Sequence, residues 1–348
     1  MKHTLKITLL LLGMFLATQL IGIAVISAYS PQVVSVVNET TGIVENVTIT
    51  PTLPYGMQPP ELKPEISLAS IIVAIVIATA LILIITKLRA RLFMRIWFFA
   101  VVWISIALTF NAFFVRFAYR NFALLAAALA LPFAFNKVFR RNIIIHNVTE
   151  LLIYPGIAAV FVPILNIWTA AALLSAISAW DIYAVWHSQI MQNMAKFQIQ
   201  QLNIFPGFFV PYMSKKEKAK LELLKKGKEK KQKTEIKIRE IRGMVRAMKA
   251  APEEKKKMRK IKKEKLKKEF AKIKVHLAIL GGGDVAFSLI FAGVALRAFG
   301  LMNALIVVAF STIALALLFI FSKKGRFYPA MPFITAGCWA GILLSLLI

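Results

Sequence analysis

The sequence contains only two aspartates, Asp181 and Asp284, and both stand inside long apolar runs. An ionisable side chain at the centre of a spanning helix costs at least about 2.5–3.5 kcal/mol, so such residues are candidates for function. Two carboxyl groups in contact do not both ionise readily, so they share a proton. The ionised member can then take a proton from water, while the protonated member donates one to a carbonyl oxygen.

The predicted depths of the two aspartates match. Asp181 lies nine residues before the predicted end of one apolar run at about 190, and Asp284 lies nine residues after the predicted start of the next at about 275. A helical rise of ~1.5 Å per residue places each roughly 14 Å from the same membrane edge. Antiparallel neighbouring helices would bring the carboxyl groups face to face. Depth alone leaves two other interpretations open, a buried pair that stabilises packing and a proton relay in a transporter.

Helix-breaking residues stand near these carboxyls. Asp284 follows Gly281-Gly282-Gly283, and glycines in a spanning helix weaken it and let another backbone approach closely. The last apolar run begins near Pro329-Ala330-Met331-Pro332, where two prolines remove two backbone donors. Irregular backbone at membrane depth is tolerated where it lines a cavity. The structural alternatives are a packing notch for the glycines and an ordinary helix start for the prolines.

The elements that must position these residues are membrane-spanning helices. Hydrophobic residues make up 59% of the 348 residues, and the mean hydropathy is +0.70, which excludes an ordinary soluble domain. Runs of about 20 apolar residues recur along the chain. They predict an all-α polytopic membrane protein with nine spans, at 7–27, 67–86, 96–115, 121–138, 147–165, 167–190, 275–297, 300–321 and 328–347.

The positive charges predict the orientation of the spans. When the segments between spans are assigned alternately to the two sides, all but four of the 44 Lys and Arg residues fall on the side of the N-terminus. The exceptions are Lys63, Arg116, Arg120 and Arg297. Because cytoplasmic segments are enriched in Lys and Arg, the N-terminus is predicted in the cytoplasm and the C-terminus outside.

These spans divide the chain into three parts. Residues 1–190 form an N-terminal six-helix part with an outer loop at 28–66, residues 191–274 a cytoplasmic basic loop, and residues 275–348 a C-terminal three-helix part. Within the long loop, the apolar stretch 197–213 suits an interfacial segment. The basic remainder accounts for much of the net charge of +28 and predicts contact with anionic lipid headgroups rather than with nucleic acid.

Taken together, the motifs resemble the presenilin and signal peptide peptidase family, the GxGD intramembrane aspartyl proteases. Gly281-Gly282-Gly283-Asp284 matches the family's GxGD on the seventh of nine predicted spans. Pro329-Ala330-Met331-Pro332 matches its PALP, with Met in place of Leu. Trp180-Asp181 stands where the family has Tyr-Asp, so a phenol is lost beside the site. The order and spacing of the motifs match from about 167 to 348.

The resemblance implies an intramembrane aspartic endopeptidase of the presenilin type. Asp181 and Asp284 would be catalytic, and the residues of the two motifs, with Trp180, would bind substrate. The implied substrates are transmembrane segments of other membrane proteins, and neither a cofactor nor a metal is expected. A compact chain that carries both aspartates predicts a single-subunit enzyme without obligate partner subunits, in the cell membrane as a multi-pass protein.

Two alternative functions remain at this stage. A prepilin peptidase also uses GxGD, but that family typically has Lys shortly after the aspartate and fewer spans, whereas Val285-Ala286-Phe287 follows here. A proton-coupled transporter could use two buried carboxyls, but it more often has internal repeats with paired broken helices, and the sequence has no evident repeat. Cleavage of a spanning peptide separates a protease from a transporter.

We predict that the basic loop is cytoplasmic. Lys230, near its middle, should resist a membrane-impermeant amine reagent on intact cells and react once the membrane is opened. Labelling of Lys230 from outside intact cells would contradict this arrangement of the spans.

Overall fold

The computed structural model describes most of the apolar runs in the chain. The described residues are 5–37, 44–49, 52–57, 69–74, 76–77, 81, 91–118, 122–140, 142–186, 206–212, 222, 276–322 and 328–347. They fall in two compact units, one made of residues 1–209 and 279–348 and the other of residues 210–278. The first unit contains all the helices discussed below.

The described helices follow the predicted apolar runs closely. They are α1 (Leu5–Ala28), α3 (Arg91–Ala118), α4 (Ala123–Phe139), α5 (Ile143–Phe161), α6 (Ile167–Trp186), α10 (Gly282–Phe299), α11 (Leu301–Phe321) and α12 (Met331–Ser345). A short 3-10 turn, η1 (Val162–Ile164), extends α5. Asn166 separates this turn from α6, where its side chain accepts a hydrogen bond from the Thr169 amide at 2.8 Å. The break predicted between the fifth and sixth spans is therefore present.

Six of these helical segments are long and apolar enough to cross a membrane, and α4 and α12 are shorter apolar helices. The second predicted span, 67–86, lies largely outside the described residues, although 69–74 and 76–77 are helical. The mostly helical membrane architecture is thus confirmed.

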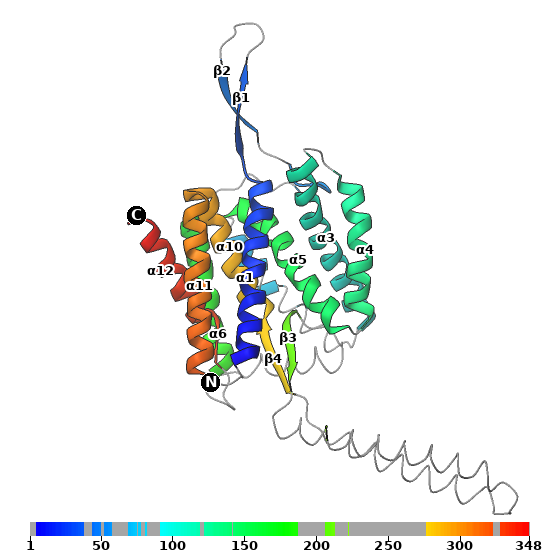
Figure 1. Cartoon of the computed structure of the whole chain (residues 1–348), viewed down its shortest axis with the longest axis vertical. Helices are drawn as coiled ribbons and strands as arrows, with labels where there is room; N and C mark the ends of the chain where they lie inside the picture. The colour runs from blue at the N-terminus through cyan, green and yellow to red at the C-terminus, as the bar shows by residue number, and fades with distance from the viewer. Residues whose placement is uncertain are drawn as a thin grey trace, which may run out of the picture. The chain divides into compact units, whose positions relative to one another are not determined.

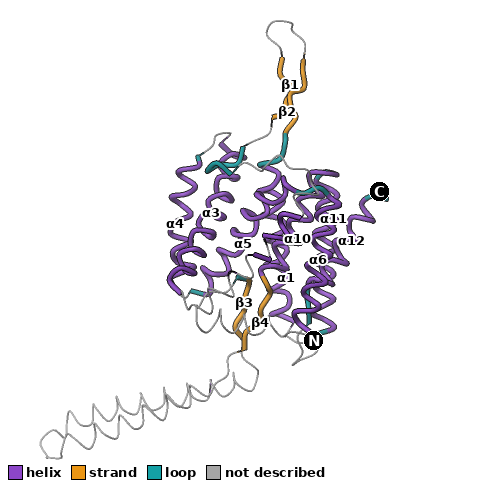
Figure 2. Tube along the Cα trace, turned by 180° about the vertical axis from the view of Figure 1, so that it is seen from behind, coloured by secondary structure: helices purple, strands orange, loops and turns teal. Residues whose placement is uncertain are grey.

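Helix α1 lies in the middle of the bundle, where it packs against α3, α5, α10 and α11 (Figure 1). Helices α3 and α4 pack together on one side of it. On the other side, α6 and α11 both pack against α10 and α12 (Figure 2). The helix that carries Asp181 and the helix that carries Asp284 are therefore direct neighbours.

Two short sheets depart from the predicted all-α architecture. Strands β1 (Gln32–Val37) and β2 (Val44–Ile49) pair antiparallel, with Gln32 opposite Ile49. Strands β3 (Gly207–Tyr212) and β4 (His276–Gly281) form the second sheet. β1 and β2 pair locally, whereas β3 and β4 satisfy their backbone groups with a segment distant in sequence, which a search for apolar runs does not detect.

The predicted start of the seventh span at residue 275 is wrong. Residues 276–281 form β4, and α10 begins only at Gly282. The apolar residues before the glycines continue the hydrophobic run, so hydrophobicity alone cannot distinguish them from a helix. The glycine triplet disfavours continuation of the helix towards the N-terminus, and β3 supplies the backbone partners of a strand. The equal-depth argument for the two aspartates therefore fails, because a helical rise does not apply to residues 276–281.

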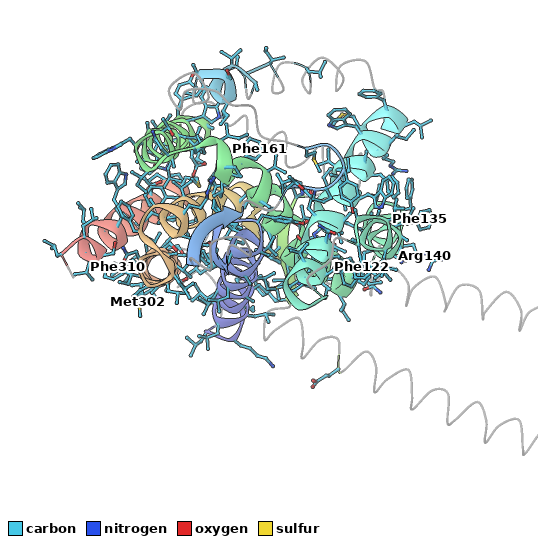
Figure 3. The ribbon with its side chains drawn as sticks, turned by 90° about the horizontal axis from the view of Figure 1, so that it is seen from above. Phe122, Phe135, Arg140, Phe161, Met302 and Phe310 are labelled. Carbon is cyan, nitrogen blue, oxygen red and sulfur yellow. The ribbon has the colours of Figure 1, made fainter. Side chains whose placement is uncertain are left out.

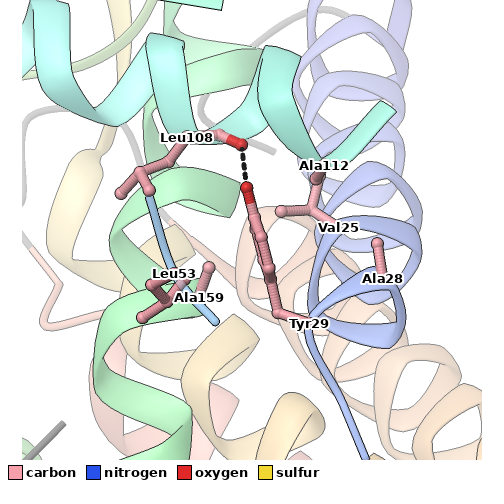
Figure 4. Close-up of a cluster of buried hydrophobic side chains, with 7 residues drawn as sticks. All are labelled: Val25, Ala28, Tyr29, Leu53, Leu108, Ala112 and Ala159. Carbon is pink, nitrogen blue, oxygen red and sulfur yellow. Dashed lines mark hydrogen bonds between the residues drawn. The ribbon is translucent and has the colours of Figure 1, made fainter. Parts of the chain in front are cut away.

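A buried cluster fixes the end of α1 to the helices beside it (Figure 4). Tyr29 lies among Val25, Leu108 and Ala159, and its hydroxyl donates to the carbonyl oxygen of Leu108 at 2.9 Å. The Asn111 side-chain amide donates to the same hydroxyl oxygen at 3.0 Å. Asn111 thus links α3 to the residue that follows α1.

The outside of the bundle is apolar. In the view from above, Phe135 of α4 and Met302 of α11 lie on opposite sides of the bundle (Figure 3). Their exposed fractions are 44% and 70%. Large apolar side chains at such exposure suit contact with lipid tails on both sides, since the helices satisfy their own backbone groups.

Helices α3 and α5 approach each other at a glycine. A Cβ added at Gly156 would collide with the carbonyl oxygen of Ser105 and lie 2.9 Å from its Cα. Only a residue without a side chain permits this backbone contact. Gly13 of α1 is the opposite case, since it is exposed and a Cβ there meets nothing within 4 Å.

We predict that Gly156→Ala destabilises the protein while Gly13→Ala does not. The first substitution overpacks a backbone contact and should cost about 1–3 kcal/mol. The second should leave stability unchanged or raise it slightly, because Ala favours a helix over Gly. The midpoint of thermal unfolding in detergent, followed by circular dichroism, measures both. Equal midpoints for the two variants would contradict the close approach.

Candidate active site

Asp284 stands in the first turn of α10, three residues after the helix cap Gly281. Its carboxylate turns back to accept the backbone N–H of Gly281, as the acidic residue of a capping box does. A side chain on residue 281 would oppose this, because a Cβ there would lie 2.9 Å from Oδ2 of Asp284. The positive end of the helix dipole also favours a negative charge at this place.

Asp181 lies on α6 and reaches the start of α12. The N–H of Met331 donates to Oδ2 of Asp181 at 3.1 Å, and the N–H of Ala330 also faces this carboxylate. Both donors belong to the helix start, whose first amides have no partner within the helix. Pro332 stands in that first turn and has no N–H of its own. The Pro-Ala-Met-Pro segment therefore begins a helix and aims its free donors at Asp181.

The two carboxyl groups lie close enough to interact electrostatically. Asp181 is buried, with 6% of its surface exposed, and Asp284 is partly exposed. The structure thus brings together two residues that are about a hundred positions apart, each held by backbone N–H groups at the start of a helix. Such a pair can hold one proton and deliver it to a reactant between the two groups.

The other predicted site residues differ in how deeply they are buried. Gly282 is buried against the ring of Tyr154, and Gly283 is exposed. Pro329 is buried beside the start of α12. Trp180 is 57% exposed and contacts the Tyr183 ring, with the ring centroids 5.8 Å apart. The indole therefore points away from Asp181, as expected for adjacent residues on a helix.

Sequence reasoning missed a polar contact next to Asp284. The Gln19 side-chain amide of α1 is fully buried, and it donates to the carbonyl oxygen of Val285 at 3.1 Å and to Oγ of Ser288 at 2.7 Å. Ser288 in turn donates to the carbonyl oxygen of Asp284 at 2.8 Å. This network ties the first turns of α10 to the central helix. A glutamine inside the first apolar run was the available signal, because polar side chains in spanning helices often form interhelical bonds.

Sequence reasoning also missed a row of polar residues on α5. His146, Glu150 and Tyr154 follow one another at intervals of four and are all buried. Glu150 pairs with Lys137 of α4, and the Tyr154 hydroxyl occupies the space where a side chain on Gly282 would lie. Glu150 falls inside the predicted fifth span, so its charge was a signal of the same kind as that of the aspartates.

Among the residues that the structure describes, no group of three or more His, Cys, Asp or Glu side chains could hold a metal ion.

The fold and the site define a class: a helical membrane protein with two interacting carboxyl groups among its apolar helices. The fold is shared with solved structures of a presenilin family intramembrane aspartate protease. The C222 crystal form has a TM-score of 0.51 and 13% sequence identity, and the match covers 98% of each chain. The P2 form has a TM-score of 0.52 and 14% identity, over 97% of this chain and 96% of that chain. No protein-family model and no curated protein sequence matches this chain.

We predict that Gln19→Met destabilises the protein by about 1–2 kcal/mol. Methionine has a similar length but cannot make the two hydrogen bonds to α10, and each ordinary bond contributes about 1 kcal/mol. Ser288→Ala is the matched variant and should cost less, since Gln19 can still donate to the carbonyl oxygen of Val285. Unfolding in denaturant, with the protein in detergent micelles, gives both values. A Ser288→Ala effect that exceeds that of Gln19→Met would contradict the central place of Gln19.

Proposed function

We propose that this protein is an aspartic endopeptidase that hydrolyses peptide bonds within transmembrane segments. The observation that carries the proposal is that Asp181 and Asp284 lie on neighbouring helices, near enough for their charges to interact, inside an apolar helix bundle whose fold is shared with presenilin family structures. The backbone N–H groups of α12 that face Asp181 stabilise its carboxylate form, which is the form that takes a proton from water. The Gly-Gly-Gly-Asp motif, whose aspartate stands in the first turn of α10, supports the GxGD type.

The reaction that we assign to the pair needs one water and one shared proton. The ionised carboxylate takes a proton from the water as the water oxygen attacks the peptide carbonyl carbon. The protonated carboxyl donates its proton to the carbonyl oxygen, which gives a tetrahedral diol. When the C–N bond breaks, a proton passes to the amine nitrogen, and the pair again holds a single proton.

The substrate must be extended at the scissile bond, because a helix shields its own amides. In the described part of the chain, β4 pairs with β3 on one edge, and no strand pairs with its other edge. β4 ends at Gly281, so a peptide strand added to that edge would run beside Asp284. The start of α12 at Pro329–Pro332, which contacts Asp181, would border the same peptide. We assign substrate binding to these segments together with Gly281–Gly283.

We further infer a single-chain enzyme in the cell membrane, with the N-terminus and the basic loop 191–274 in the cytoplasm and the C-terminus outside. Its substrates are spanning segments of other membrane proteins. The support is the distribution of Lys and Arg together with the apolar exterior of the bundle.

We predict that Asp181→Asn and Asp284→Asn each abolish cleavage while expression and helix content stay nearly unchanged. Asparagine keeps the size of the side chain but neither takes the proton of water nor supplies an acid proton. Asp→Glu at either position should lose on the order of 100-fold, because one added methylene displaces the carboxyl by about 1 Å. The measurement is mass spectrometry of a single-span peptide after incubation with purified protein in detergent.

The same assay with the wild-type chain separates the competing functions. A transporter would leave the peptide intact, and a structural carboxyl pair would tolerate Asn or become more stable, since a neutral amide costs less to bury than a charge. More than about a tenth of wild-type cleavage in either Asn variant would be incompatible with the two-aspartate mechanism.

A further inference from the structure

The N-terminal half of α5 contacts the backbone of β3 through polar side chains. The Asn147 amide donates to the carbonyl oxygen of Phe209 at 3.0 Å, and its Oδ1 accepts the N–H of the same residue at 3.2 Å. The His146 Nε2–H donates to the carbonyl oxygen of Gly207 at 2.9 Å. Asn147 thus presents to β3 the donor and acceptor that a neighbouring strand would present.

These three bonds all lie on one edge of β3. The N–H and C=O of one residue in a strand point to the same edge, and those of the residue two positions away point there as well. The bonds from Gly207 and Phe209 therefore occupy the edge away from β4, and β4 takes the other edge. With both edges paired, β3 has no edge left for another strand at these residues.

A buried ion pair holds His146 in the required tautomer. The Lys137 ammonium can only donate, and its Nζ lies 3.4 Å from Nδ1 of His146. Nδ1 is therefore the acceptor, and Nε2 carries the hydrogen that Gly207 receives. Glu150 pairs with Lys137 and balances its charge inside the bundle. Lys137 and Glu150 serve β3 indirectly, through the orientation of this imidazole.

Aromatic contacts extend the connection from β3 to the active-site helix. The Phe209 ring packs on the His146 ring, with centroids 4.3 Å apart. Phe208 is fully buried and meets the Tyr154 ring edge-on at 6.1 Å. The hydroxyl end of Tyr154 lies against Gly282, two residues before Asp284. One face of α5 therefore contacts both β3 and the start of α10.

We propose that His146 and Asn147 are positioning residues that close the edge of β3 away from β4. A substrate strand can then add only to β4, beside Asp284. The polar face of α5 occupies the competing edge and holds the sheet in register with the start of α10. The consequence for substrate rests on the proposed proteolytic function, whereas the closed edge is a property of the fold alone.

The first arm of the test measures the edge without reference to activity. The Phe209 amide is the reporter, because its hydrogen bond is made to Asn147. In the full chain in detergent, Asn147→Ala should speed deuterium uptake at this amide by about tenfold or more. The matched control is Asn136→Ala on α4, which removes an exposed amide bonded to its own helix at the carbonyl of Pro132 and should change nothing at Phe209. Unchanged uptake in Asn147→Ala would overturn the proposal.

The second arm measures kcat and KM on a single-span peptide. Asn147→Ala and His146→Ala should raise KM by about tenfold with a smaller change in kcat, because the extended peptide meets a sheet that is no longer held. His146→Gln keeps a donor near the position of Nε2 and should restore KM. Faster exchange at Phe209 with wild-type KM, or equal KM for His146→Ala and His146→Gln, would overturn the positioning role.

The two arms fail separately. In one outcome, the wild-type chain cleaves no peptide, but Asn147→Ala still loses protection from deuterium exchange at the Phe209 amide. That outcome would refute the proposed protease and the role in substrate docking, while the closed edge of β3 would stand. Cleavage that depends on both aspartates but not on Asn147 or His146 would refute the positioning role and leave the protease in place.

Discussion

The structure depends on one constraint: two carboxyl groups placed among apolar helices need backbone donors. Asp181 obtains them from the start of α12, and Asp284 obtains one from its own cap at Gly281. Both sources are the free N–H groups of a helix N-terminus, which also favour negative charge. Because Asp181 lies on α6 and its donor on α12, satisfying this carboxyl fixes the relative position of two helices. The site is therefore part of what orders the C-terminal helices.

The remainder of the bundle supports these two helix starts. Gln19 connects the central helix to the first turns of α10, and Gly282 lets Tyr154 pack against the very start of that helix. Polar bonds of this kind are single contacts among many apolar ones, yet they set the angular position of a helix where apolar packing alone tolerates small rotations. The polar face of α5 extends the same support to β3. Side-chain hydrogen bonds thus tie a strand to the helical bundle.

Secondary structure around the two aspartates differs for a physical reason. Asp181 lies within a continuous helix, whereas Asp284 lies in the first turn of a helix that directly follows a strand. An extended segment in an apolar bundle must find partners for its backbone groups, and β3 provides them on one side. The other edge of β4 is the edge to which we propose that an extended substrate adds. Helices alone would satisfy every backbone group internally and would leave no strand edge.

The sequence by itself determined the apolar segments, because their length and composition are local properties, and it identified the two aspartates, because charge inside such segments is conspicuous. It also carried the GxGD and Pro-Ala-Met-Pro motifs and hence the resemblance whose fold the structure shares. Tertiary structure alone decided that 276–281 is a strand, that Met331 binds Asp181, and that α5 pairs with β3. Each of these depends on a partner far away in the chain, 150 positions in the case of Met331 and Asp181. Local hydrophobicity contains no information about such partners, since a strand and a buried helix can contain the same run of apolar residues.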